Sequence, residues 1–174
     1  MLTGILLLFC SFFNPAMDTI DNREWKTLEM NDFKIDYPAE WQGESFENSV
    51  QEFTITSPYE NEEDYYADFV NLAILKLPGL NKNLETYVTE FSRDIPFIYQ
   101  KAMIRTNEKA VRAGRECYIL EYAGVFNDFP IAYRQYIWFQ NESAYTLSFT
   151  AQQGSFEHWE SVATKIMDSF TFKK

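Results

Sequence analysis

The feature that most constrains the fold is a stretch of alternating apolar and polar residues near the carboxyl terminus, AYTLSFTAQ at 144–152. Every second residue from Tyr145 to Ala151 is apolar, and the residues between them are Ser or Thr. A period of two is typical of a β-strand with one face in the core. The run IAYRQYIWFQ at 131–140 also has strand character, and only NES at 141–143 separates the two. So short a connection predicts an antiparallel hairpin.

Four more segments have strand character. Phe33, Ile35 and Tyr37 alternate with polar residues, and Pro38 is expected to stop that strand because proline cannot donate to a ladder. We expect Trp41, three residues later, to fold back into the core. The other three segments are EFTITS at 52–57, FVNLAILKL at 69–77 and ECYILEYAG at 116–124. The run at 69–77 is apolar on both faces, which predicts a central strand with cover on both sides.

Two segments change to a helical period. In NLETYVTEFSRDI at 83–95, apolar residues recur at helical spacing, with Asn83 as the expected N-cap and Pro96 expected to end or kink the helix. A final helix is expected at about 155–168, with Phe156, Trp159, Ala163 and Ile166 on its apolar side. The sequence therefore predicts an α+β fold, in which an antiparallel sheet of about six strands is flanked by helices.

The first residues of the sequence differ from the rest in being apolar and uncharged. LTGILLLFCSFFNPA carries no charge, and its apolar run is too short to cross a bilayer, which fits the core of a secretory signal. We therefore expect a leader at 1–17 and a single domain at 18–174, in a protein exported to the bacterial cell envelope, either periplasmic or membrane-anchored. LLFC loosely resembles a lipobox with Cys10 as the lipidation site, and cleavage after Ala16 is the alternative.

The net charge of −11 makes nucleic acid an unlikely partner, because phosphate binding relies on a basic surface. One stretch is nevertheless locally basic, and its cations include Lys101, Arg105, Lys109 and Arg112. We expect either a solvated loop and strand edge or a docking patch for an acidic partner or headgroup.

No motif for catalysis or for a cofactor is present. The one histidine, His158, falls off the apolar side of the last helix and is expected to face solvent, and Cys117 has no second cysteine nearby. The acidic loop at 60–68 could bind Ca²⁺ through Glu60, Glu62 and Asp64, although it lacks the spacing of an EF-hand. We therefore expect no enzyme and no cofactor, with a carboxylate- or metal-dependent hydrolase built on this loop as the alternative.

Aromatic residues at turns are the better clue to binding. Phe126 and Phe129 flank a turn where polar residues are usual, and Tyr65 and Tyr66 flank the acids of the 60–68 loop. Such side chains either cover a sheet edge or form a partner-binding patch. The hypothesis from the residues alone is a binding protein for a protein partner or an apolar ligand.

The order and spacing of these segments resemble the PsbP/Mog1-like superfamily, which includes DcrB-like envelope lipoproteins. The resemblance covers about residues 30–172 and rests on MNDFKIDYPAEW, TITSPYENEEDYYADFVNLAILKL, NLETYVTEFSRDI, AGRECYILEYAG, RQYIWFQNESAYTLSFTAQ and FEHWESVATKIMDSFTF. It implies an α/β/α sandwich and a role in binding or assembly without catalysis. Roles in that superfamily range from photosystem extrinsic subunit to effector chaperone, and fold analogy cannot choose among them.

Overall fold

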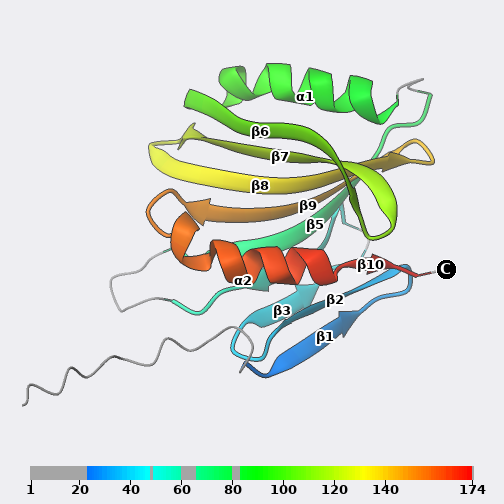
Figure 1. The fold of residues 1–174 in the computed structure, drawn as a ribbon, viewed down its shortest axis with the longest axis vertical. Coiled ribbons are helices and arrows are strands. Elements are labelled where there is room, and N and C mark those ends of the chain that lie inside the picture. The colour runs from blue at the N-terminus through cyan, green and yellow to red at the C-terminus, as the bar shows by residue number, and fades with distance from the viewer. Residues whose placement is uncertain (1–22, 48, 60–65, 80–82, 174) are drawn as a thin grey trace, which may run out of the picture.

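The computed structural model describes residues 23–47, 49–59, 66–79 and 83–173. Ten strands and two helices follow one another along these residues (Figure 1). In chain order they are β1 (Trp25–Glu29), β2 (Phe33–Pro38), β3 (Gln42–Ser45), β4 (Gln51–Thr56), β5 (Phe69–Lys76), α1 (Leu84–Ile98), β6 (Gln100–Arg112), β7 (Arg115–Phe126), β8 (Phe129–Gln140), β9 (Ser143–Gln152), α2 (Phe156–Ser169) and β10 (Thr171–Phe172).

The main sheet has seven strands in the order β3-β4-β5-β9-β8-β7-β6. Its second half is the antiparallel meander β6–β7–β8–β9, joined by three two-residue turns at 113–114, 127–128 and 141–142. All six turn residues have positive φ, which is the conformation that lets a two-residue hairpin match the twist of its strands. The predicted hairpin at 141–143 is therefore confirmed, as is the interior position of the strand at 69–77, which lies between β4 and β9.

A second, three-stranded sheet in the order β1-β2-β10 is the main departure from the prediction of about six strands. The FKIDY strand belongs to this small sheet, where the last strand of the chain, β10, pairs with β2. The alternation of buried Phe33, Ile35 and Tyr37 is nevertheless confirmed. Pro38 is the last residue of β2, and Trp41 is buried in the core.

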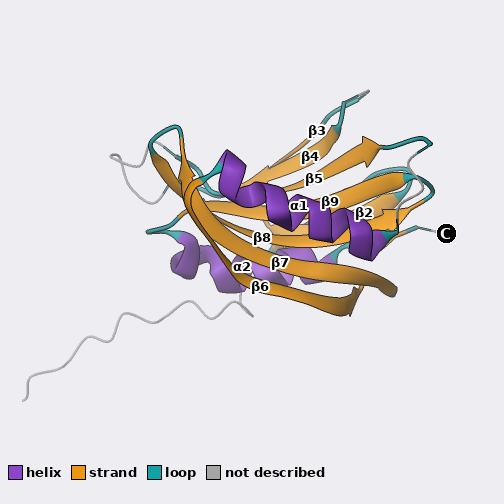
Figure 2. Cartoon of the chain, turned by 90° about the horizontal axis from the view of Figure 1, so that it is seen from above, coloured by secondary structure: helices purple, strands orange, loops and turns teal. Residues whose placement is uncertain are grey.

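The helices cover opposite faces of the main sheet (Figure 2). Tyr136 and Trp138 of β8 pack in the cluster that contains α2, whereas the intervening Ile137 packs in the cluster that contains α1. Because successive strand residues point to opposite faces, this alternation places one helix on each side. The predicted α+β sandwich is confirmed.

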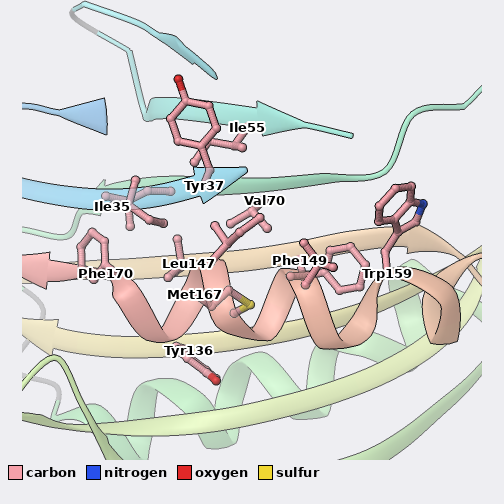
Figure 3. Close-up of a cluster of buried hydrophobic side chains, with 14 of the residues drawn as sticks. Ile35, Tyr37, Ile55, Val70, Tyr136, Leu147, Phe149, Trp159, Met167 and Phe170 are labelled. Carbon is pink, nitrogen blue, oxygen red and sulfur yellow. The ribbon is translucent and has the colours of Figure 1, made fainter. Parts of the chain in front are cut away.

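The larger core lies between α2, the main sheet and the small sheet. Figure 3 shows Ile35 and Tyr37 of β2 gathered with Val70 of β5, Leu147 of β9 and Met167 of α2. The predicted apolar side of α2 is confirmed, because each of its expected residues, including Trp159 and Ile166, is buried. The smaller core lies between α1 and strands β7 and β8.

Helix α1 begins as predicted but ends later. The side chain of Asn83 caps it by accepting a hydrogen bond from the amide of Thr86 at 2.9 Å. The helix continues through Pro96 to Ile98, and the amide of Tyr99 still donates to the carbonyl of Ile95 at 3.0 Å. Proline lacks its own amide donor and crowds the carbonyl four residues earlier, but the amides that follow it can still donate, so the last turn forms. Among the described residues, no helix is long and apolar enough to cross a membrane.

Candidate binding groove

A groove of about 560 Å³ opens on the α1 face of the main sheet, at the end that carries the β7–β8 turn. Its aromatic and aliphatic walls are Tyr66, Phe69, Phe126, Phe129, Ile131 and Tyr133. We call it the aromatic groove. Its volume falls in the range of about 300–1,000 Å³ that is usual for small-ligand sites.

The groove exists because α1 does not extend over the whole sheet. Helix α1 packs on β6, β7 and β8, so the same face beyond β8 carries residues of β9 and β5. There, Thr150 pairs with both Phe69 and Tyr133, and Ser148 pairs with Asn71 in the next row. These two cross-strand rows form the floor of the groove and bring together strands that are about 80 residues apart in sequence.

The floor is polar and uncharged. It offers the hydroxyls of Ser148 and Thr150 and the amides of Gln51 and Asn71, with Asn127 at the turn. None of the described residues that line the groove is charged. In a chain of net charge −11, this neutral lining favours an occupant without charge.

A cluster of tyrosines supports the groove wall from below α1. The rings of Tyr122 and Tyr133 stack with centroids 4.7 Å apart, and Tyr99 contacts both at 5.5 Å. The ring of Tyr99 also lies 5.7 Å from that of Phe126. This chain of ring contacts connects the end of α1 to the β7–β8 turn and holds the wall in place.

The tyrosine hydroxyls stay protonated. Burial is the main factor that raises the pKa of Tyr122 and Tyr133, and hydrogen bonds to Tyr99 add to the increase. Burial also raises the pKa of Tyr66, where the nearby Asp68 contributes. A neutral phenol can donate and accept hydrogen bonds but is no general base at neutral pH, so this chemistry suits binding.

The structure brings together three of the four aromatic residues predicted as a partner-binding set. Phe126, Phe129 and Tyr66 all line the aromatic groove, and Tyr65 lies outside the described residues. Sequence reasoning missed Phe69, Asn71, Ser148 and Thr150. The only signal for them was the polar face of the 144–152 strand, and its neighbour β5 cannot be identified from local periodicity.

The four predicted basic residues lie on β6, at the edge of the main sheet, but do not share one surface. Lys109 pairs with Glu85 of α1 at 2.9 Å, whereas Arg112 pairs with Asp168 of α2 at 3.1 Å on the opposite face. Lys101 and Arg105 are exposed near the start of the strand. The bulges of β6 around Lys101 and Arg105 separate these two from the paired cations.

The remaining predicted site residues lie outside the described part of the chain: Glu60, Glu62, Asp64 and Cys10. Within the described part, no group of His, Cys, Asp and Glu could hold a metal ion. His158 is exposed, as predicted, and lies against the ring of Trp159.

A second hollow, of about 410 Å³, lies where α1 begins, and Cys117 is among the residues that line it. Burial raises the pKa of this thiol to about 11. The thiolate is the reactive form, so we expect Cys117 in the native chain to resist iodoacetamide at pH 8 and to react fully in urea. Peptide mass spectrometry after timed labelling measures this reactivity, and fast native alkylation at pH 8 would contradict the burial of the thiol.

The raised pKa of Cys117 also predicts that the free energy of unfolding falls as the pH rises from about 9 to about 11, because only the unfolded chain then loses the thiol proton.

No protein-family model matches the chain, and no curated protein matches it either. Solved structures do match. Cyanobacterial PsbP (CyanoP) from Synechocystis sp. PCC 6803 is 13% identical with a TM-score of 0.58, over 86% of this chain and 92% of that one. LpqN, involved in cell envelope biogenesis of Mycobacterium tuberculosis, is 13% identical with a TM-score of 0.59, over 89% and 95%.

A third similar structure is PA94 from Pseudomonas aeruginosa, a protein of unknown function described as a putative regulator. It is 10% identical with a TM-score of 0.61, over 83% of this chain and 94% of that one. At identities this low, the TM-scores show a shared fold and nothing more. The high coverage shows that the fold extends over nearly all of each chain. The described residues therefore have the PsbP-like fold.

Proposed function

We propose that this chain is a non-catalytic accessory protein of the bacterial cell envelope, and that its aromatic groove holds an uncharged apolar group of a protein partner or of an apolar ligand. The observation that carries the proposal is the groove itself, with aromatic walls and a neutral polar floor. Such sites bind by burying apolar area while a few polar groups fix the orientation. The name of LpqN, a protein of cell envelope biogenesis, and the apolar leader at 1–17 support the location.

A hydrolase built on the acidic loop remains the alternative, with Glu60, Glu62 and Asp64 as its carboxylates. The binding function is favoured because the described residues supply a shaped, uncharged groove and raised tyrosine pKa values, which suit holding a ligand better than proton transfer. Elemental analysis of the native protein for a bound metal tests the metal-dependent form, and hydrolytic activity that is lost in Glu62→Gln/Asp64→Asn would support a hydrolase of either kind.

The test is capture of partners from a solubilised envelope fraction with the wild-type chain, two groove variants and a control variant. Replacing Phe126 and Phe129 together by Ala removes two aromatic side chains from the walls of the groove, and Asn71→Phe places a large side chain on its floor. Each should reduce recovery of a specific partner by at least about thirtyfold, since interface hot spots contribute about 2 kcal/mol or more.

The matched control for this capture is Val111→Ala, which truncates an exposed apolar side chain on β6 far from the groove. This variant should recover the partner as the wild type does. Undiminished recovery by both groove variants, with folding intact by circular dichroism, would show that the groove is not the binding site.

A further inference from the structure

Two large apolar side chains project into solvent at the last turn of α1. Phe97 is 86% exposed, the highest value for a large apolar residue among those described, and Ile98 is 50% exposed. Phe126 and Phe129, which flank the β7–β8 turn, are also exposed. We call these four residues the apolar tip. Exposed apolar side chains that gather in one place usually mark an interaction surface.

The four residues come from two segments that meet in space. Gln100, just after α1, pairs with Val125, just before the β7–β8 turn, and the ring of Tyr99 contacts that of Phe126. Figure 1 shows the end of α1 and the β7–β8 turn at the same end of the sheet, on the left. The apolar tip is thus one feature of the fold, built at two places in the chain.

Two cations accompany the tip. Lys101 and Arg105 are exposed at the start of β6, and neither has an ion-pair partner in the described part of the chain. Among the acids close to these residues in sequence or strand pairing, Asp94 pairs with Arg93, Glu121 pairs with Arg134, and Asp128 lies in the β7–β8 turn. Within the described residues, Lys101 and Arg105 are therefore unpaired cations on the strand that follows the tip, in a chain that is acidic as a whole.

The convex shape of the apolar tip favours a lipid surface over a protein partner. A helix end and a two-residue turn are convex, so their side chains protrude singly, and a protein partner would need a matching hollow for each. A lipid interface accepts protruding apolar side chains independently, while cations beside them contact anionic headgroups. We propose that the apolar tip docks this protein on an anionic lipid surface, with Phe97 and Ile98 at the boundary between headgroups and acyl chains and with Lys101 and Arg105 beside lipid phosphates.

This docking is separate from the proposed function of the aromatic groove. Phe97 and Ile98 do not line the groove, so they can be changed without altering it. Phe126 and Phe129 belong to both surfaces, and docking would therefore bring the mouth of the groove to the membrane. Partner capture in solution tests the groove, and the lipid experiment below uses only residues outside it.

The experiment is flotation of the full chain with vesicles of phosphatidylcholine that contain a minority of phosphatidylglycerol. The double variant Phe97→Ser/Ile98→Ser should bind at least about tenfold more weakly, because it removes the two apolar side chains that would be buried in the lipid. The double variant Lys101→Glu/Arg105→Glu should lose roughly tenfold or more at low salt and show a smaller deficit at high salt. The control Val111→Ser, at an exposed valine of β6 distant from the tip, should bind as the wild type does.

Immersion depth gives the deciding readout, because residues 1–22 include an uncharged apolar run that could bind lipid without the tip. A spin label is placed at residue 97 or at residue 111, each in a Cys10→Ser background, and its depth is measured on the vesicles. A label at 97 below the headgroups and a label at 111 in water are expected. Both labels in water, or flotation unchanged by Phe97→Ser/Ile98→Ser, would overturn the proposal.

Discussion

Replacing Trp41 by Ala should lower the free energy of unfolding by about 3–5 kcal/mol, the usual cost of truncating a buried tryptophan. Trp41 is 2% exposed and packs edge-on against Trp159, with ring centroids 5.3 Å apart. This contact joins the segment after β2 to the first turn of α2, so a cavity there weakens the link between the small sheet and the main core. Urea denaturation followed by fluorescence measures the change.

Trp41→Phe should cost much less, about 1 kcal/mol. The indole N–H of Trp41 is buried and has no hydrogen-bond partner among the described residues, so phenylalanine removes a group that is costly to bury. Trp138 is the matched control, because its indole donates to the carbonyl of Arg112 at 3.2 Å. Trp138→Phe loses that bond and should cost more than Trp41→Phe. The reverse order would show that the Trp41 indole has a polar partner that the described residues do not supply.

Arg134→Met should destabilise the fold by about 2–4 kcal/mol, because it leaves a buried carboxylate without its partner. The guanidinium of Arg134 donates through Nε to Glu121 and through Nη2 to Glu160, each at 2.6 Å, and it also contacts Thr164. The side chains of Arg134 and Glu121 are both only 17% exposed. This network connects β7 and β8 to α2 through one side chain.

Two further variants give that prediction its controls. Arg134→Met/Glu121→Leu removes both charges and should recover most of the lost stability, since the penalty arises from the unpaired carboxylate. Arg93→Met breaks an ion pair with Asp94 whose two side chains are more than half exposed, and should change stability by less than about 1 kcal/mol. Equal losses for Arg134→Met and Arg93→Met by urea denaturation would contradict the role given to the buried network.

Much of the fold could be predicted where local periodicity reflects burial. The strand at 144–152, the apolar side of α2 and the cap at Asn83 follow from spacing alone, because each depends on residues close together in sequence. The strand β6 does not follow from periodicity, because most of its residues are exposed and they do not alternate between apolar and polar, as an edge strand with bulges permits. The small sheet could not be predicted, since β10 pairs with β2 over about 140 residues.

The same distinction applies to the candidate site, where some residues could be predicted from local sequence and others could not. Phe126 and Phe129 were predictable because two phenylalanines flanking a tight turn are unusual. The floor of the groove was not, because it depends on β5 lying beside β9, and no local pattern specifies which strands become neighbours. The basic stretch shows that residues close together in sequence need not share a surface. Its Lys109 and Arg112 point to opposite faces of the sheet.

The central claim, that the aromatic groove is the binding site, is tested most directly by site-specific photo-crosslinking in the envelope. Benzoylphenylalanine replaces Phe129 or Phe69, two aromatic residues that line the groove, or Val111 at the distant edge of the sheet. We predict one discrete adduct shared by positions 129 and 69 and absent at 111, and its mass identifies the occupant. Crosslinks that are the same at all three positions, or absent at both groove positions, would contradict the claim.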